Sequence, residues 1–317
     1  MRPECSSIIL TKTNIRPMKL VKNTFVQMAF SVKRRSNYLL IFLNGFLLAS
    51  LAYFYIEDSY EQKVFTSLAD YVKFTSLQKT GSIKTENLIT TSLTLTNYLG
   101  QGRRKIFEGQ DLNSIKSELI HPVSFDLMTG KGACGSYSYI LSRVLSELNI
   151  PNRIAQMKVS DNYGGHNIVE AQTPDGWVVL DPLFNISFKK PDGKMASFSD
   201  IQRNWQYYQS QLPVGYNSNY NYAGVRYTNW DKIPVIMPAV KKVLEWTIGK
   251  ERTEVFSIRT HMLKKFSMLL NIGFILYVLI FLVTLRKFII RKREAKFFDP
   301  KHLFPKRSSS VTLHSMS

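Results

Sequence analysis

The chain has 317 residues, and its 42 lysine and arginine residues against 23 acidic residues give a formal net charge of +19. Most of this excess lies in two basic tails, residues 1–37 and 286–317. Basic tails beside apolar segments are typical of chains that lie against an anionic membrane surface. Because no nucleic-acid-binding motif accompanies the charge, we expect no nucleic-acid partner.

Two long apolar runs, residues 38–56 and 268–285, contain no charged residue. Each is long enough to cross a hydrocarbon core of about 30 Å as a helix. The first run follows a long polar arm, so it begins too deep in the chain for a cleaved signal peptide and indicates a signal anchor. We therefore expect two transmembrane helices, with membrane lipid as their partner.

The charges that flank the two runs predict the orientation of the chain. Basic residues precede the first run, acidic residues follow it, and five basic residues follow the second (Lys33, Arg34 and Arg35; Glu57, Asp58 and Glu61; Arg286, Lys287, Arg291, Lys292 and Arg293). By the positive-inside rule both termini are cytoplasmic, and residues 57–267 lie outside the plasma (inner) membrane, in the periplasm or the extracellular space. Cys5 and Cys134 then lie on opposite sides, so we expect no disulfide between them.

The region outside the membrane is large enough for one globular domain, whose core we place at about residues 120–190. Its first part, Glu57–Leu77, has apolar residues at helical spacing and is expected to continue the first membrane helix as a stalk. Thr85–Leu119 also has helical character, but its threonine-rich portion LITTSLTLTNYL is equally compatible with a strand.

Cys134 lies at a position that suits a nucleophile. It follows the glycine-rich turn GKGAC and begins a segment in which apolar residues recur every three or four positions (Tyr137, Leu141, Leu145 and Leu148). This spacing predicts a helix that ends at Asn149 and Pro151. The unpaired N–H groups and the positive dipole end of a helix's first turn favour a thiolate over a thiol.

Downstream, two short apolar runs carry a histidine and an aspartate. Gly164–Gln172 and Gly176–Pro182 are separated by turn residues, which predicts a β-hairpin, and Arg153–Val159 predicts a third strand. Antiparallel pairing about a turn centred near residue 174 places His166 opposite Asp181. A carboxylate beside an imidazole fixes its tautomer and leaves the other ring nitrogen to accept the thiol proton.

These residues resemble the transglutaminase-like superfamily, whose core pattern is a Gly-x-Cys helix start, a GIP-x-R exit, an H-x-x-x-E strand and a GW-x-x-x-DP strand. The chain has GAC, NIPNR, HNIVE and GWVVLDP in this order, within Gly130–Pro182. It departs from the pattern at Asn149, Asn167 and Ile168, where the family often has glycine, alanine and an aromatic residue.

The resemblance implies a membrane-anchored α+β domain of the papain-like or transglutaminase-like kind, with a cysteine-bearing helix packed on an antiparallel sheet between two transmembrane helices. It implies Cys134 as nucleophile, His166 as base and Asp181 as the residue that orients the base. The substrate would be a peptide or protein amide, and the reaction would pass through a thioester intermediate. We expect hydrolysis slightly more than transfer to an amine, and neither a cofactor nor a metal, because no zinc-ligand spacing is present. The alternative is a non-enzymatic binding or assembly module at the cell surface.

The stretch Trp205–Trp230 interleaves aromatic residues with asparagine, glutamine, glycine and serine. Flat rings beside amide groups suit extended peptides, and also a glycan or a cell-surface polymer. The competing interpretation is that these rings pack a loop against the core. Four residues are our candidates for substrate binding (Trp177, Tyr207, Tyr216 and Trp230).

Overall fold

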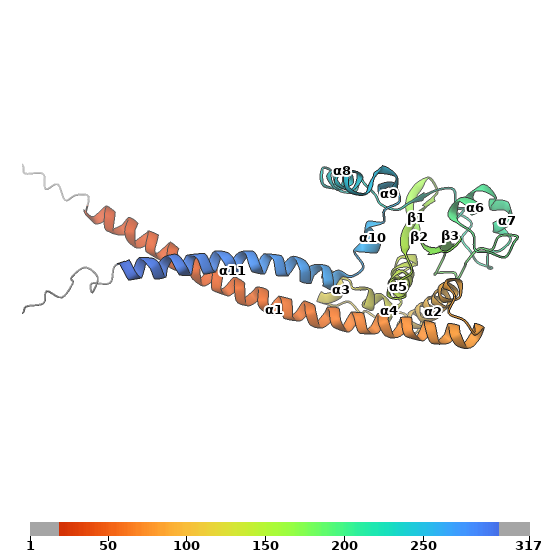
Figure 1. The fold of residues 1–317 in the computed structure, drawn as a ribbon, viewed down its shortest axis with the longest axis horizontal. Helices are drawn as coiled ribbons and strands as arrows, with labels where there is room; N and C mark the ends of the chain where they lie inside the picture. Colours follow the sequence, from red (N-terminus) through yellow and green to blue (C-terminus); the bar gives the residue numbers. More distant parts are fainter. Residues whose placement is uncertain (1–18, 298–317) are drawn as a thin grey trace, which may run out of the picture. The chain divides into compact units, whose positions relative to one another are not determined.

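The computed structural model describes residues 19–297, and the chain divides into two compact units. One, the two-helix unit, holds the described residues up to Leu51 and from Ile272 onward; the other, the domain, is residues 52–271. Figure 1 shows that the domain combines helices with a sheet. The predicted mixture of helix and antiparallel sheet is therefore confirmed.

Two long helices carry the two apolar runs. α1 (Lys19–Thr80) contains the first run and α11 (Lys265–Phe297) contains the second. Both are long and apolar enough to span a membrane, and only 6% of the most apolar 18-residue stretch of each is buried. In the core of a soluble protein such a stretch would be covered by other side chains, so this exposure fits lipid surroundings. Asn44 Nδ2 donates to Thr284 Oγ1 at 3.0 Å, a polar contact of the kind that joins helices in membranes.

The stalk and the threonine-rich segment are both helical. α1 continues without a break to its end, and its buried residues Phe65, Ala69 and Val72 recur at helical spacing. The threonine-rich segment, open between helix and strand in the sequence, forms α2 (Thr85–Ile106). Two short helices follow, α3 (Ile115–Leu119) and α4 (Val123–Thr129).

The sheet has the strand order β3-β2-β1-β4 and is antiparallel. Its strands are β1 (Asn152–Val159), β2 (Asn162–Thr173), β3 (Gly176–Leu180) and the short β4 (Val225–Arg226). The predicted hairpin corresponds to β2 and β3, and the predicted third strand corresponds to β1. All three strands are therefore confirmed, although β2 begins two residues earlier than expected.

The hairpin register corrects the expectation that His166 lies opposite Asp181. Val169 pairs with Leu180 and Thr173 pairs with Gly176, so Ile168 is the position that would face Asp181 if the register continued. The turn has two residues between the paired ends, and its centre lies one residue later than a pairing of His166 with Asp181 requires. The resulting offset of two residues keeps both side chains on one face of the sheet, because side chains alternate with a period of two.

α5 (Cys134–Glu147) packs on one face of this sheet, where Ile154, Val169 and Leu180 join the core that it forms with α1, α2 and α4. The helix ends where expected, and Asn149 takes a left-handed φ of 57°. The opposite face is covered by an aromatic cluster from the chain that follows β3, including α6 (Phe198–Arg203) and α7 (Trp205–Gln209).

Three further helices precede α11: α8 (Ile236–Ile248), α9 (Lys250–Glu254) and α10 (Ile258–His261). The segment at α10 is fixed to the main chain of β1. Ile154 N donates to Thr260 Oγ1 at 2.9 Å, and Ser257 Oγ donates to Ile154 O at 2.7 Å. These two bonds bring the C-terminal part of the domain beside the strand that pairs with the His166 strand.

Candidate active site at the first turn of α5

The nucleophile candidate Cys134 is the first residue of α5, and its side chain is half-buried. Two glycines shape the turn before it. Gly130 ends α4 with a left-handed φ of 58°, and a Cβ on Gly132 would lie 1.7 Å from Ser136 Oγ. The residue before the helix, Ala133, makes no side-chain capping bond, so no side chain of that residue competes with a bound anion for the N–H of Cys134, whereas Ser136 N donates to Ala133 O at 3.1 Å.

α4 holds this turn in place through a buried carboxylate. Asp126 accepts a hydrogen bond from Ser136 Oγ, in the first turn of α5, and contacts His121 Nε2 at 3.1 Å. Its side chain is almost fully buried. The contact therefore fixes the start of α5 to a neighbouring helix without using the thiol.

His166 and Asp181 form a fully buried pair. His166 Nε2 lies 2.7 Å from Asp181 Oδ2, and neither side chain is exposed to solvent. The same carboxylate accepts from Leu183 N at 3.2 Å and from Tyr216 OH at 3.3 Å. With both oxygens engaged, Asp181 holds the imidazole in one orientation and assigns Nε2 as the protonated nitrogen of the pair.

Aromatic rings cover the imidazole. Tyr220 stacks on His166 with ring centroids 4.1 Å apart and an interplanar angle of 11°, and Phe184 lies 6.1 Å away. The β1–β2 register is irregular next to His166, between Met157 and Lys158, and such a bulge re-aims the side chains beside it. Nδ1 of His166 has no hydrogen-bond partner of good geometry among the described residues, so its interaction with the Cys134 thiol is loose.

The electrostatics favour an ion pair between the thiol and the imidazole. Burial lowers the pKa of His166, but the charge and hydrogen bond of Asp181, helped by Cys134, outweigh it and raise that pKa to about 9. Burial likewise raises the pKa of Cys134, but the hydrogen bond and positive charge of His166 outweigh it, and the pKa of the thiol is lowered. The thiolate and the imidazolium therefore stabilise each other.

Asn167, the residue after His166, points to the opposite face of β2 from His166 and lies near Cys134. Its Nδ2 lies 4.0 Å from Cys134 Sγ, and Arg259 Nη1 donates to its Oδ1 at 3.4 Å. A guanidinium only donates, so the carboxamide oxygen must face Arg259 and the NH₂ group must face the sulfur. This residue was a departure from the family pattern without an assigned role, and no local pattern marks Arg259, which comes from α10.

The four aromatic candidates for substrate binding lie in different places. Tyr216 is in the site, bonded to Asp181. Trp177 stacks on the Arg153 guanidinium at 4.2 Å. Tyr207 packs edge-on against Tyr208, and Trp230 lines a separate hollow of about 530 Å³ with Tyr163 and Arg226. The rings that the structure brings to the imidazole are Tyr220 and Phe184, which the sequence did not single out as site residues.

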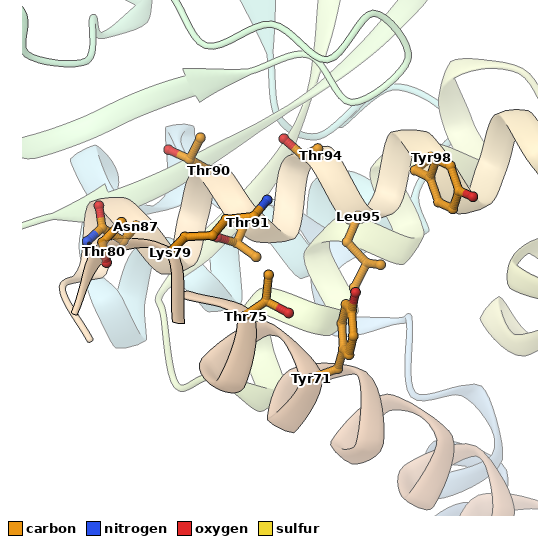
Figure 2. Close-up of a pocket in the computed structure, with 10 residues that line it drawn as sticks. All are labelled: Tyr71, Thr75, Lys79, Thr80, Asn87, Thr90, Thr91, Thr94, Leu95 and Tyr98. Atoms are coloured by element: carbon orange, nitrogen blue, oxygen red, sulfur yellow. Dashed lines mark hydrogen bonds between the residues drawn. The ribbon is translucent and has the colours of Figure 1, made fainter. Parts of the chain in front are cut away.

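Another hollow, of about 340 Å³, lies between the end of α1 and α2 (Figure 2). Tyr71 on α1 points toward Leu95 on α2, and Thr75 on α1 lies beside Thr91 on α2 (Figure 2). Its lining contains none of the three triad residues. Two threonine hydroxyls of this wall bond to the backbone of their own helices: Thr90 Oγ1 to Glu86 O and Thr80 Oγ1 to Ser76 O, each at 2.8 Å. A hydroxyl already engaged in this way offers little to a ligand.

Comparison of the chain with protein-family models, with curated proteins and with solved structures finds no match.

Proposed function

We propose that this protein is a membrane-tethered thiol acyl-transfer enzyme with a papain-like, transglutaminase-like core. The observation that carries the proposal is the His166 imidazole. It bonds to Asp181 through Nε2, and its positive charge lowers the pKa of the Cys134 thiol at the start of α5. Burying a histidine and an aspartate completely is costly unless they are paired. A polar pair of this kind beside a half-exposed thiol supports chemistry more than packing.

The proposed reaction begins when the Cys134 thiolate attacks the carbonyl carbon of a peptide or protein amide. The C–S bond forms, and the carbonyl oxygen becomes an oxyanion. His166 then gives its Nδ1 proton to the amide nitrogen, the C–N bond breaks, and an amine leaves a thioester on Cys134. In the second half, water gives a proton to His166 and attacks the thioester, which releases a carboxylic acid and restores the thiolate and the imidazolium.

The oxyanion needs two donors, and the site offers two candidates. The backbone N–H of Cys134 is one, since it belongs to the uncapped first turn of α5. The second is the Asn167 carboxamide, whose NH₂ group Arg259 directs toward the sulfur. A carbonyl carbon bonded to Sγ would place its oxygen close to both groups.

The half-exposed thiol and the polar side chains beside it support water as the acceptor more than an amine. The domain and its substrate would lie outside the membrane, with both termini cytoplasmic. Two lysines, Lys264 and Lys265, precede the second apolar run on the side that the charge rule disfavours. Both are engaged by the domain: Lys264 Nζ lies 3.4 Å from Glu147, and Lys265 Nζ donates to His121 O at 2.5 Å. Lysines held by domain groups fit the proposed orientation.

The test uses the full chain in lipid nanodiscs with Cys5→Ser, so that Cys134 is the one thiol. p-Nitrophenyl acetate is added, and the intact mass is followed for an acetyl group on Cys134. The adduct should form rapidly and then decay as water attacks; an added primary amine reports transfer instead. Cys134→Ala is the control without a nucleophile. If the wild-type protein stays unmodified, the non-enzymatic binding module remains as the hypothesis.

The same assay separates the role of Asp181 from that of a turn residue before Pro182. Asp181→Asn keeps the shape of the side chain but loses the charge that stabilises the imidazolium. Acylation should fall on the order of a hundredfold or more in a folded protein. Near-wild-type rates in Asp181→Asn, with unchanged circular dichroism, would remove Asp181 from the site.

A further inference from the structure

α8 is exposed in a way that is unusual for a helix of a folded domain. None of its residues is buried. One face carries a continuous apolar row at helical spacing, and two apolar residues before the helix extend it (Ile236, Val240, Val243 and Trp246; Ile233 and Val235). The exposed fraction is 87% for Trp246 and 82% for Val235.

The side of α8 that faces the protein mixes apolar with charged residues, and its half-buried apolar residues are Met237, Leu244 and Ile248. Lys241 and Glu245 are half-buried there, and Lys241 Nζ bonds to Glu254 Oε1 in α9 at 2.8 Å. A surface helix of a soluble domain usually turns its apolar face inward and its charged face to water. α8 instead carries apolar residues on both sides, so the exposed row is left over after the helix has packed on the domain and needs a cover that is not water.

The chain itself indicates which cover is available. Residues 249–264 separate α8 from α11, the helix that contains the second apolar run. This connection contains α9 and α10, and helical residues rise only about 1.5 Å each. Two bonds to Ile154 fix α10 to β1, so the connection cannot extend freely. α8 is therefore tethered close to the point where the chain enters its second membrane-spanning helix.

Charge and residue type agree with a lipid surface. Lys242 and Lys250 are exposed at the middle and just beyond the end of α8. Lysine ammonium groups suit lipid phosphates, and tryptophan is enriched at the level of lipid headgroups. A second copy of the chain would instead need a matching apolar face, and burial of that row alone is small beside the ~800 Å² per partner of a stable interface.

We propose that α8 is an interfacial helix that lies on the outer leaflet of the same bilayer, with its Ile236–Trp246 row in the boundary between headgroups and acyl chains. The proposal depends on the two spanning helices and not on the chemistry at Cys134. It gives the domain a third contact with the membrane and so restricts its rotation about the two spans.

The test uses the full chain, one copy per lipid nanodisc, with Cys5→Ser and Cys134→Ser. An environment-sensitive NBD dye is attached to Val243→Cys or, as the matched control, to Asp192→Cys in an exposed loop of the same domain. Nanodiscs are made with phosphatidylcholine and phosphatidylglycerol, with and without lipids brominated near the headgroup. The dye at residue 243 should emit at shorter wavelength and lose at least twofold in intensity with brominated lipid, whereas the dye at residue 192 should not respond.

A measurement without an attached dye tests the same proposal. Tryptophan emission of the unlabelled full chain should be quenched by brominated lipid, and Trp246→Phe should remove most of that quenching. Water-like emission and no bromine quenching at residue 243 would contradict the proposal. So would a shift at residue 243 that appears only in nanodiscs with two copies, because that outcome assigns the face to a second chain.

Discussion

The state of the Cys134 thiol depends mainly on one neighbour. Burial raises its pKa, and the hydrogen bond and charge of His166 lower it further than burial raises it. The imidazolium keeps its proton until the pH approaches its own pKa of about 9. The ion pair therefore persists from the lowered pKa of the thiol up to about pH 9, and it is lost on either side of that window.

This balance predicts how alkylation of Cys134 depends on pH. In a Cys5→Ser background, iodoacetamide should react with a midpoint below that of an ordinary thiol. His166→Ala leaves burial without its compensation, so the midpoint should rise above the ordinary value. His302→Ala, in the C-terminal tail, is the matched control and should not move it. If the midpoint in the folded wild-type protein is that of an ordinary thiol, the thiolate and the imidazolium do not form an ion pair.

A second substitution separates stabilisation of the oxyanion from stabilisation of the thiolate. Asn167→Ala should slow acylation by p-nitrophenyl acetate about 100- to 1,000-fold, as expected for the loss of one oxyanion donor. Alkylation by iodoacetamide forms no oxyanion, so its rate should stay within a few-fold when the thiol is fully ionised. Asn162→Ala, at the start of the same strand, should leave both rates unchanged.

Equal losses in the two reactions of Asn167→Ala would instead assign the carboxamide to the thiolate. Arg259→Met should reproduce part of the acylation loss, because the carboxamide could then rotate its oxygen toward the sulfur. If wild-type protein showed no acylation at all, the proposed function would fail before this comparison began.

Residues of the site differ in how visible they are in the sequence. Cys134, His166 and Asp181 lie within a short segment, each in a local pattern that indicates a helix start or a strand. Arg259 reaches Asn167 from 92 positions away, so only the folded chain brings them together. The same limit applies to the aromatic stretch, where composition could not distinguish Tyr220, stacked on the imidazole, from Tyr207, packed elsewhere.

At the level of elements, the start of α5 depends on a close backbone approach at Gly132. A Cβ at this position would meet Ser136 Oγ at 1.7 Å and force the first turn of α5 away from Asp126. Gly102 in α2 has nothing within 4 Å of the same added atom. Gly102→Ala is therefore a suitable control for Gly132→Ala.

Gly132→Ala should lower the free energy of unfolding by about 1–3 kcal/mol, the usual cost of overpacking, and should slow acylation because Cys134 moves. Gly102→Ala should be neutral or should stabilise α2 by up to about 1 kcal/mol. Thermal unfolding of both variants in nanodiscs, together with the acylation rate, measures the difference. Equal behaviour of the two variants would contradict a tight first turn.

Elements were predictable where a pattern is local and regular. The three strands and the helix after Cys134 follow from period and turn residues, and Asn149 ends the helix with the left-handed φ that asparagine tolerates. The hairpin register was wrong because it depends on the exact length of the turn. The threonine-rich segment was ambiguous because threonine favours strands, whereas burial of Ile89 and Leu93 against the core decided for a helix.

At the level of the whole molecule, two apolar runs were enough to predict two helices of spanning length, and flanking charges predict their direction. In a background without Cys5 and Cys134, Asp192→Cys should react with a membrane-impermeant maleimide in whole cells. Ser310→Cys should react only after the membrane is opened. If Ser310→Cys is labelled in intact cells and Asp192→Cys is protected, the topology is the reverse of the predicted one.

The bonds from Ser257 and Thr260 to Ile154 also set an order of events during synthesis. They join Ile154 to residues 103 and 106 positions later, so the outer edge of β1 at Ile154, beyond the part that pairs with β4, stays open while all of the intervening chain is made. An open strand edge is a template for pairing with another chain. Protection of this part of the edge arrives only with the segment that directly precedes α11, so its closure and membrane entry of the second apolar run become nearly simultaneous steps in biogenesis.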